Sequence, residues 1–166
     1  MEKNNLPRVS DILKASGISD FSKVPIDILE DGQHFGTAVH LACELWDRGT
    51  LDIATLSEPI IPRLEAWKKF LKDYEAYIIL EAIEKQHISK KWGFKGSPDR
   101  LAFIHERFTL IDIKSSTAMS PSTEIQTAGY QILVEEESKG KVDNRWGVQL
   151  KEDGKYSIEV YKDISD

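Results

Sequence analysis

At 166 residues, with 40% hydrophobic and 30% charged residues, the chain is long enough for one compact domain and has an ordinary globular composition. No stretch approaches the roughly 18 consecutive apolar residues of a membrane span. The N-terminal residues show no apolar secretory signal, so we expect a cytoplasmic protein without membrane contact. The single cysteine, Cys43, excludes an internal disulfide and a cysteine-ligated zinc or iron–sulfur site.

The formal net charge of −6 counts against a protein that binds nucleic acid through bulk positive charge. It does not exclude an enzyme with a locally basic substrate groove. Four lysines lie close together before the acidic motifs described below: Lys85, Lys90, Lys91 and Lys95. A solvated surface is the simpler explanation of such a cluster.

The first half of the chain predicts mainly helices. Residues 9–16 form a short helix capped by Ser10 and ended by Gly17. After a loop with Pro25 and Asp31-Gly32, a longer helix covers residues 35–46 and stops at Gly49. A third helix covers residues 62–74, where apolar residues recur at helical spacing. Residues 77–88 fit either a helix or a strand, and we favour a helix that yields to a strand near Glu84.

The second half predicts a sheet with one helix. Residues 98–104 and 108–114 are apolar and β-branched around a polar turn, which indicates a β-hairpin. A helix follows over residues 123–136, and then two strands over 145–151 and 155–161, joined by Asp153-Gly154. The predicted fold class is α/β (α+β), with a mixed central sheet flanked by helices in a single domain, residues 1–166.

The hairpin brings charged side chains together if its turn has an even number of residues. Phe103 then faces Phe108, Leu101 faces Leu110, and Asp99 faces Asp112. Lys114 lies two residues beyond Asp112 and projects from the same face. Both faces of these strands are largely apolar, so we expect the sheet to be covered on both sides.

Two carboxylates among apolar strands need a partner, and a hard divalent cation suits them, with lysine as a nearby charge. This chemistry fits phosphodiester hydrolysis, in which Mg²⁺ or Mn²⁺ polarises the phosphate and lowers the pKa of a bound water. Lys114 would orient or activate that water. A surface ion pair on an edge strand is the simpler explanation of the short Asp112-Ile113-Lys114 motif alone.

Further motifs accompany this one in the sequence. Together these motifs resemble those of the PD-(D/E)XK nucleases, particularly the RecB-like exonuclease branch. Residues 96–100 (GSPDR) and 110–116 (LIDIKSS) match the paired catalytic motifs. An upstream helical motif is matched by GTAVH, residues 36–40, and a downstream one by QTAGY, residues 126–130. Glu84 matches an acidic residue before the first catalytic motif, with Glu81 as the alternative. The resemblance covers about residues 6–161.

This resemblance implies a restriction-endonuclease-like fold and a set of roles. His40, Asp99, Asp112 and the carbonyl of Ile113 would be metal ligands, Lys114 the catalytic lysine, and Glu84 an acid serving a second metal. Gln126 and Tyr130 would lie on a helix beside the active centre and contact DNA or the lysine. Arg100 and Ser115 are candidates to bind substrate phosphates.

Simpler alternatives exist for several of these residues. His40 lies on an apolar helix, where a core histidine with one hydrogen bond is the commoner finding. Gln126 lies three residues after Thr123, which also fits a helix capping box. Tyr130 fits the core equally well, and Arg100 and Ser115 fit as ordinary polar residues beside a site.

The sequence therefore predicts a Mg²⁺- or Mn²⁺-dependent deoxyribonuclease, by resemblance an exonuclease, that acts in recombination, repair or phage DNA processing. No iron–sulfur cluster is expected, although relatives with four cysteines carry one. DNA is the expected partner, and a homo-oligomer or a recombination protein stays open. The alternatives are a catalytically inactive nucleic-acid-binding or assembly subunit, and a phosphoesterase acting on RNA or a small nucleotide.

Overall fold

The computed structural model describes residues 5–20, 22 and 24–162. Its main sheet has five strands in the order β1-β4-β5-β6-β7. The bounds are β1 Tyr77–Ile78, β4 Arg100–Ile104, β5 Arg107–Lys114, β6 Asn144–Leu150 and β7 Tyr156–Tyr161. The β5–β6 pair is parallel and the other pairs are antiparallel, so the sheet is mixed, as the sequence predicted.

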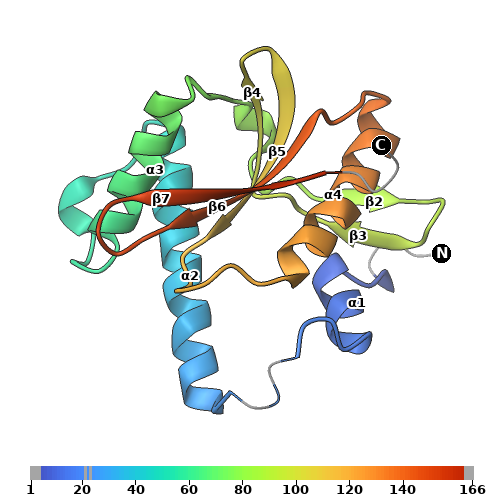
Figure 1. Ribbon diagram of the computed structural model, residues 1–166, viewed down its shortest axis with the longest axis horizontal. Helices are drawn as coiled ribbons and strands as arrows, with labels where there is room; N and C mark the ends of the chain where they lie inside the picture. Colours follow the sequence, from blue (N-terminus) through green and yellow to red (C-terminus); the bar gives the residue numbers. More distant parts are fainter. Residues whose placement is uncertain (1–4, 21, 23, 163–166) are drawn as a thin grey trace.

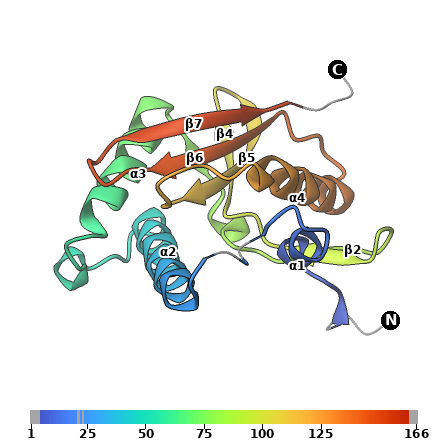
Figure 2. The same ribbon diagram turned by 60° about the horizontal axis from the view of Figure 1, so that its bottom comes forward.

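Helices cover both faces of this sheet (Figures 1 and 2). On one face, α2 (Ile26–Asp47) and α3 (Ile61–Asp73) pack Val39, Cys43, Trp67 and Phe70 against strand residues such as Ile113. On the other face, α1 (Val9–Ala15) and α4 (Ser122–Ser138) pack Val9 and Leu133 against Leu101 and Leu110. The expected two-sided burial of the sheet is confirmed.

The β4–β5 hairpin has the register predicted from the sequence. Phe103 pairs with Phe108 and Leu101 pairs with Leu110. The turn consists of His105 and Glu106, both with positive φ, 48° and 65°. Two-residue hairpin turns with positive φ at both positions match the right-handed twist of the strands. The even turn length therefore fixes which side chains of β5 face α4.

Four predictions about the elements were wrong. Helix α2 begins at Ile26 and runs through Asp31-Gly32, because Pro25 sits at its N-cap and a single glycine within a helix costs only about 1 kcal/mol. Residues 77–88 contain no α-helix: they form β1, a short 3₁₀ helix Leu80–Ala82, and β2. The N-cap of α1 is Arg8 rather than Ser10.

The fourth error is an omission, a second sheet. Strands β2 (His87–Ser89) and β3 (Phe94–Gly96) form an antiparallel hairpin beside α4. Glu136 of α4 holds its turn, since the carboxylate accepts hydrogen bonds from the hydroxyl of Ser89 and the backbone N–H of Lys90. None of the described helices is long and apolar enough to cross a membrane.

The turns of the β4–β5 and β6–β7 hairpins allow a matched stability test. Glu106 has a φ of 65°, whereas Glu152, in the turn between β6 and β7, is outside the left-handed region. Removing the Cβ relieves strain only at the first position, so Glu106→Gly should raise the free energy of unfolding by up to about 1 kcal/mol. Glu152→Gly should lower it by a similar amount. Urea denaturation of both variants measures this, and an equal effect at the two positions would contradict the turn geometry.

Candidate active site

The site forms where the C-terminal part of β5 extends past the first residue of β4. The last pair between these strands is Arg100 with Ile111, so Ile113 has no strand partner on that side. Side chains take the place of the missing strand. The backbone N–H of Ile113 donates to Asp99 Oδ2 at 2.6 Å, and its carbonyl accepts from His40 Nε2 at 2.9 Å. One residue of β5 therefore orients both Asp99 and His40.

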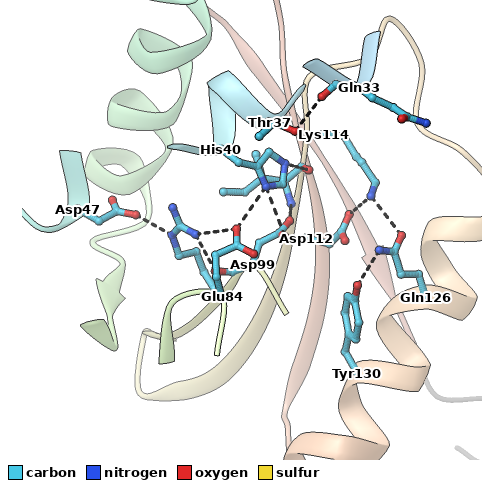
Figure 3. Close-up of polar contacts among 12 residues, drawn as sticks. Gln33, Thr37, His40, Asp47, Glu84, Asp99, Asp112, Lys114, Gln126 and Tyr130 are labelled. Atoms are coloured by element: carbon cyan, nitrogen blue, oxygen red, sulfur yellow. Dashed lines mark hydrogen bonds and ion pairs between the residues drawn. The ribbon is translucent and has the colours of Figure 1, made fainter. Parts of the chain in front are cut away.

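His40, Glu84 and Asp99 converge on a single point, although they come from separate elements (Figure 3). His40 lies on α2, Glu84 follows the short 3₁₀ helix with a φ of 52°, and Asp99 directly precedes β4. Nδ1 of His40 is 3.4 Å from Glu84 Oε1 and 3.5 Å from Asp99 Oδ1. The three ligand atoms all lie within 4.8 Å of one another, a spacing that suits ligands of one metal ion.

A series of polar contacts beside this group begins at Asp112 and ends at Tyr130 on α4. Lys114 Nζ is 2.8 Å from Asp112 Oδ2 and donates to Gln126 Oε1 at 3.2 Å. The amide nitrogen of Gln126 donates to the hydroxyl of Tyr130 at 2.9 Å. Asp112 and Lys114 share the α4 face of β5 because alternate strand residues point to the same side. The alternative role of Gln126 as a capping residue is wrong, since its side chain is engaged here.

These residues fit a divalent cation on three observations. Carboxylate oxygens and one imidazole nitrogen are suitable ligands for such ions. A metal-ligating histidine typically donates its other ring N–H to a carboxylate or a carbonyl, and His40 Nε2 does so to Ile113. Oδ1 of Asp112 is buried without a hydrogen-bond partner among the described residues, so it has an unused lone pair.

The electrostatics of the site show an excess of negative charge. Burial lowers the pKa of His40, but the carboxylates of Asp99, Glu84 and Asp112 outweigh it and raise that pKa to about 9. Burial raises the pKa of Asp112 to about 6 despite the opposing charge of Lys114. The pKa of Lys114 is raised, because Asp112 and Asp99 outweigh its desolvation. Protons on His40 and Lys114 therefore supply the positive charge that the carboxylates require.

The structure brings together most of the residues singled out in the sequence. Glu84, rather than Glu81, lies against His40. Ser115 follows β5 and lies near Gly36 of α2, whose ideal Cβ would be 3.7 Å from the serine hydroxyl. Tyr130 is largely buried, with its hydroxyl facing Gln126.

Arg100 lies elsewhere than expected for a substrate contact. Its side chain is fully buried and its Nε donates to Asp47 Oδ2 at 2.7 Å. In this position the guanidinium has no surface to offer a substrate in solution.

Three residues near the site were not singled out for it. Asp47 binds the buried Arg100, and nothing in the sequence relates two residues 53 positions apart. Arg8 lines two cavities next to Glu84, of about 300 and 790 Å³, so it brings a positive charge close to the site. Gly96 allows Tyr130 to approach closely, since an ideal Cβ at this position would be 2.7 Å from Tyr130 Cε1. Only this last residue had a sequence signal, as the first letter of the GSPDR motif.

Comparisons with known proteins give little further information. No protein-family model matches the sequence, and no curated protein matches it. Among solved structures, the chain is similar to one named "Putative exonuclease" from Eubacterium rectale, with 9% identity and a TM-score of 0.38. The similarity covers 76% of this chain and 57% of that one. A similarity this weak identifies neither a family nor an activity.

The pKa of His40 predicts how metal binding depends on pH. Below about pH 9, His40 carries a proton that a metal must displace, so the association constant for Mn²⁺ should rise with pH, by up to tenfold per unit. Calorimetric titration between pH 7 and 8.5 measures this slope. His40→Asn removes the proton, so its slope should be clearly shallower. Equal slopes for the variant and the wild type would exclude His40 as the group that titrates.

Proposed function

We propose that this chain is a metal-dependent deoxyribonuclease of the PD-(D/E)XK type, in which residues 1–166 form one nuclease domain. The observation that supports it best is the convergence of His40, Glu84 and Asp99, with ligand atoms within 4.8 Å, next to the Asp112–Lys114 pair. The residues of four separate sequence motifs meet at this point. A structural role alone would not require so many charged groups at one end of an apolar sheet.

In this proposal His40, Asp99 and Asp112 hold Mg²⁺ or Mn²⁺, and Glu84 completes the group or serves a second ion. The sequence motifs also suggest the carbonyl of Ile113 as a ligand. It would contact the ion if the ion replaced the proton between this carbonyl and Nε2 of His40, with Nε2 rather than Nδ1 as the histidine ligand. The bound ion would polarise the scissile phosphate and favour ionisation of the attacking water.

Lys114 acts as a charged hydrogen-bond donor rather than as a base. Its pKa is raised by Asp112 and Asp99, so the ammonium keeps its proton at neutral pH. It orients the attacking water and stabilises negative charge that develops on the phosphate in the transition state. Gln126 holds the ammonium in place, and Tyr130, whose pKa burial raises to about 12, holds Gln126 as a neutral phenol.

The finer parts of the proposal rest on the resemblance of the sequence motifs. These are DNA as the substrate, attack from strand ends, and a role in recombination, repair or phage DNA processing. Ser115 remains a proposed contact to a phosphate beside Lys114, and Arg8 is added because it lines both cavities next to Glu84.

The test is cleavage of end-labelled linear DNA, single- and double-stranded, with Mg²⁺, Mn²⁺ or EDTA. We expect metal-dependent degradation from the ends, with closed circular DNA left intact. Lys114→Ala should lower kcat at least about 100-fold, the size of effect seen when one transition-state donor is removed. Lys155→Ala is the matched control, since this lysine lies in the exposed turn before β7 and should leave kcat unchanged.

The outcomes separate the candidate functions. Loss of activity in folded Lys114→Ala, with Mn²⁺ binding retained, supports the proposed role of the lysine. Cleavage of RNA or of a small phosphodiester, but not of DNA, would replace the substrate assignment. A wild-type protein that binds DNA and metal but cleaves none of these substrates would refute the enzyme proposal in favour of a binding subunit.

A further inference from the structure

Arg100 is a fully buried arginine directly behind the candidate metal group. Its Nε donates to Asp47 Oδ2 at 2.7 Å, and one Nη donates to the backbone carbonyl of Asp99 at 2.7 Å. The same Nη lies 3.6 Å from Glu84 Oε1. Arg100 therefore contacts two of the three residues that converge on the candidate site, one through its backbone and the other through its carboxylate.

The partner of Arg100 comes from the helix that carries the third residue. Asp47 lies seven residues after His40 on α2, about two helical turns, so both side chains lie on the same side of the helix. Figure 3 shows Asp47 and Glu84 with the other residues around the site. Trp67 of α3 donates from Nε1 to the second oxygen of Asp47 at 2.8 Å and fixes the carboxylate further.

Stability alone is a poor explanation for this ion pair. Burying two charges costs several kcal/mol per ion, and apolar residues of similar size often stabilise a core equally well. The burial raises the pKa of Asp47, which shows the cost of placing a carboxylate there. An ion pair at this position makes sense if it determines geometry. Asp47 lies on the helix that carries His40, and Arg100 contacts both Asp99 and Glu84.

We propose that Asp47 and Arg100 are positioning residues that set the spacing of His40, Glu84 and Asp99 for metal binding. The Nε–carboxylate bond fixes α2, and with it His40, relative to the start of β4. The Nη bonds the carbonyl of Asp99 and faces the carboxylate of Glu84, so both acidic residues are held against the same guanidinium. Arg100 acts through these residues and touches neither the metal nor the substrate. The inference rests on the proposed metal site.

The test compares Mn²⁺ affinity, measured calorimetrically, across conservative variants. Arg100→Lys keeps a positive charge but cannot bond Asp47, Asp99 and Glu84 at once, and Asp47→Asn keeps the shape but removes the charge. Each should weaken Mn²⁺ binding at least tenfold. The matched control is Arg145→Lys, which alters another buried arginine, one that donates to the carbonyls of Glu124 in α4 and of Lys162 just after β7. It should leave Mn²⁺ affinity within twofold.

A second readout distinguishes positioning from a general loss of stability. The visible absorption spectrum of bound Co²⁺ depends on ligand arrangement, so it should change in folded Arg100→Lys and stay the same in Arg145→Lys. Near-UV circular dichroism verifies that each variant is folded. A folded Arg100→Lys with wild-type Mn²⁺ affinity and an unchanged Co²⁺ spectrum would overturn the proposal.

The wild-type protein provides a test that needs no variant. In nuclear magnetic resonance, the Nε–H signals of Arg100 and Trp67 should shift during a Mg²⁺ titration with the same midpoint as the signals of His40. Unchanged Arg100 and Trp67 signals alongside a shifting His40 would show that the pair is uncoupled from the site, and the proposal would fail. If the His40 signals neither shift with Mg²⁺ nor broaden with paramagnetic Mn²⁺, the metal site itself is refuted.

Discussion

The arrangement of the site depends on the backbone N–H and C=O of Ile113, which have no strand partner on the β4 side. A strand residue that extends past its neighbour leaves an N–H and a C=O without ladder partners, and buried backbone groups are almost always satisfied in folded proteins. Here a carboxylate and an imidazole supply the partners, since Asp99 accepts from the N–H and His40 donates to the carbonyl. The two side chains are thereby oriented by a rigid central strand. The second ring nitrogen of His40 and the second carboxylate oxygen of Asp99 lie close to each other and to the carboxylate of Glu84.

The charges of the site form two layers at different depths. The accessible layer contains His40, Glu84 and Lys114, whose side chains are roughly a quarter to two-fifths exposed. The buried layer contains Asp112 and the Asp47–Arg100 pair. The carboxylates outnumber the fixed cations around His40, which explains why His40 holds a proton so firmly. A divalent ion would take the place of that proton and neutralise the same charges.

The sequence was sufficient where local rules decide the structure. Strand alternation and an even turn placed Asp112 and Lys114 on one face, and the register of Phe103 and Leu101 followed from the same rules. Helix spacing placed Gln126 and Tyr130 side by side. Local rules failed where short elements depend on distant partners. The strands β2 and β3 have three residues each, too few for an alternating pattern, and Glu136 of α4 holds their turn.

The contacts of the site between residues far apart in the chain could not be predicted from the sequence either. Arg100 looked like a polar residue flanking a motif, but its burial depends on Asp47, which is far away in the chain. The motif match identified Glu84, but the positive φ at this residue, next to its contact with His40, follows from no pattern in residues 77–88.

The absence of a side chain at Gly96 has a mechanical consequence. Strand β3 packs so closely on Tyr130 that no Cβ fits between them, and Tyr130 is bonded through Gln126 to Lys114. The β2–β3 hairpin is therefore connected to the ammonium group by an unbroken series of contacts. A displacement of the hairpin, which contributes no residue to the metal group, would be transmitted to the position of Lys114.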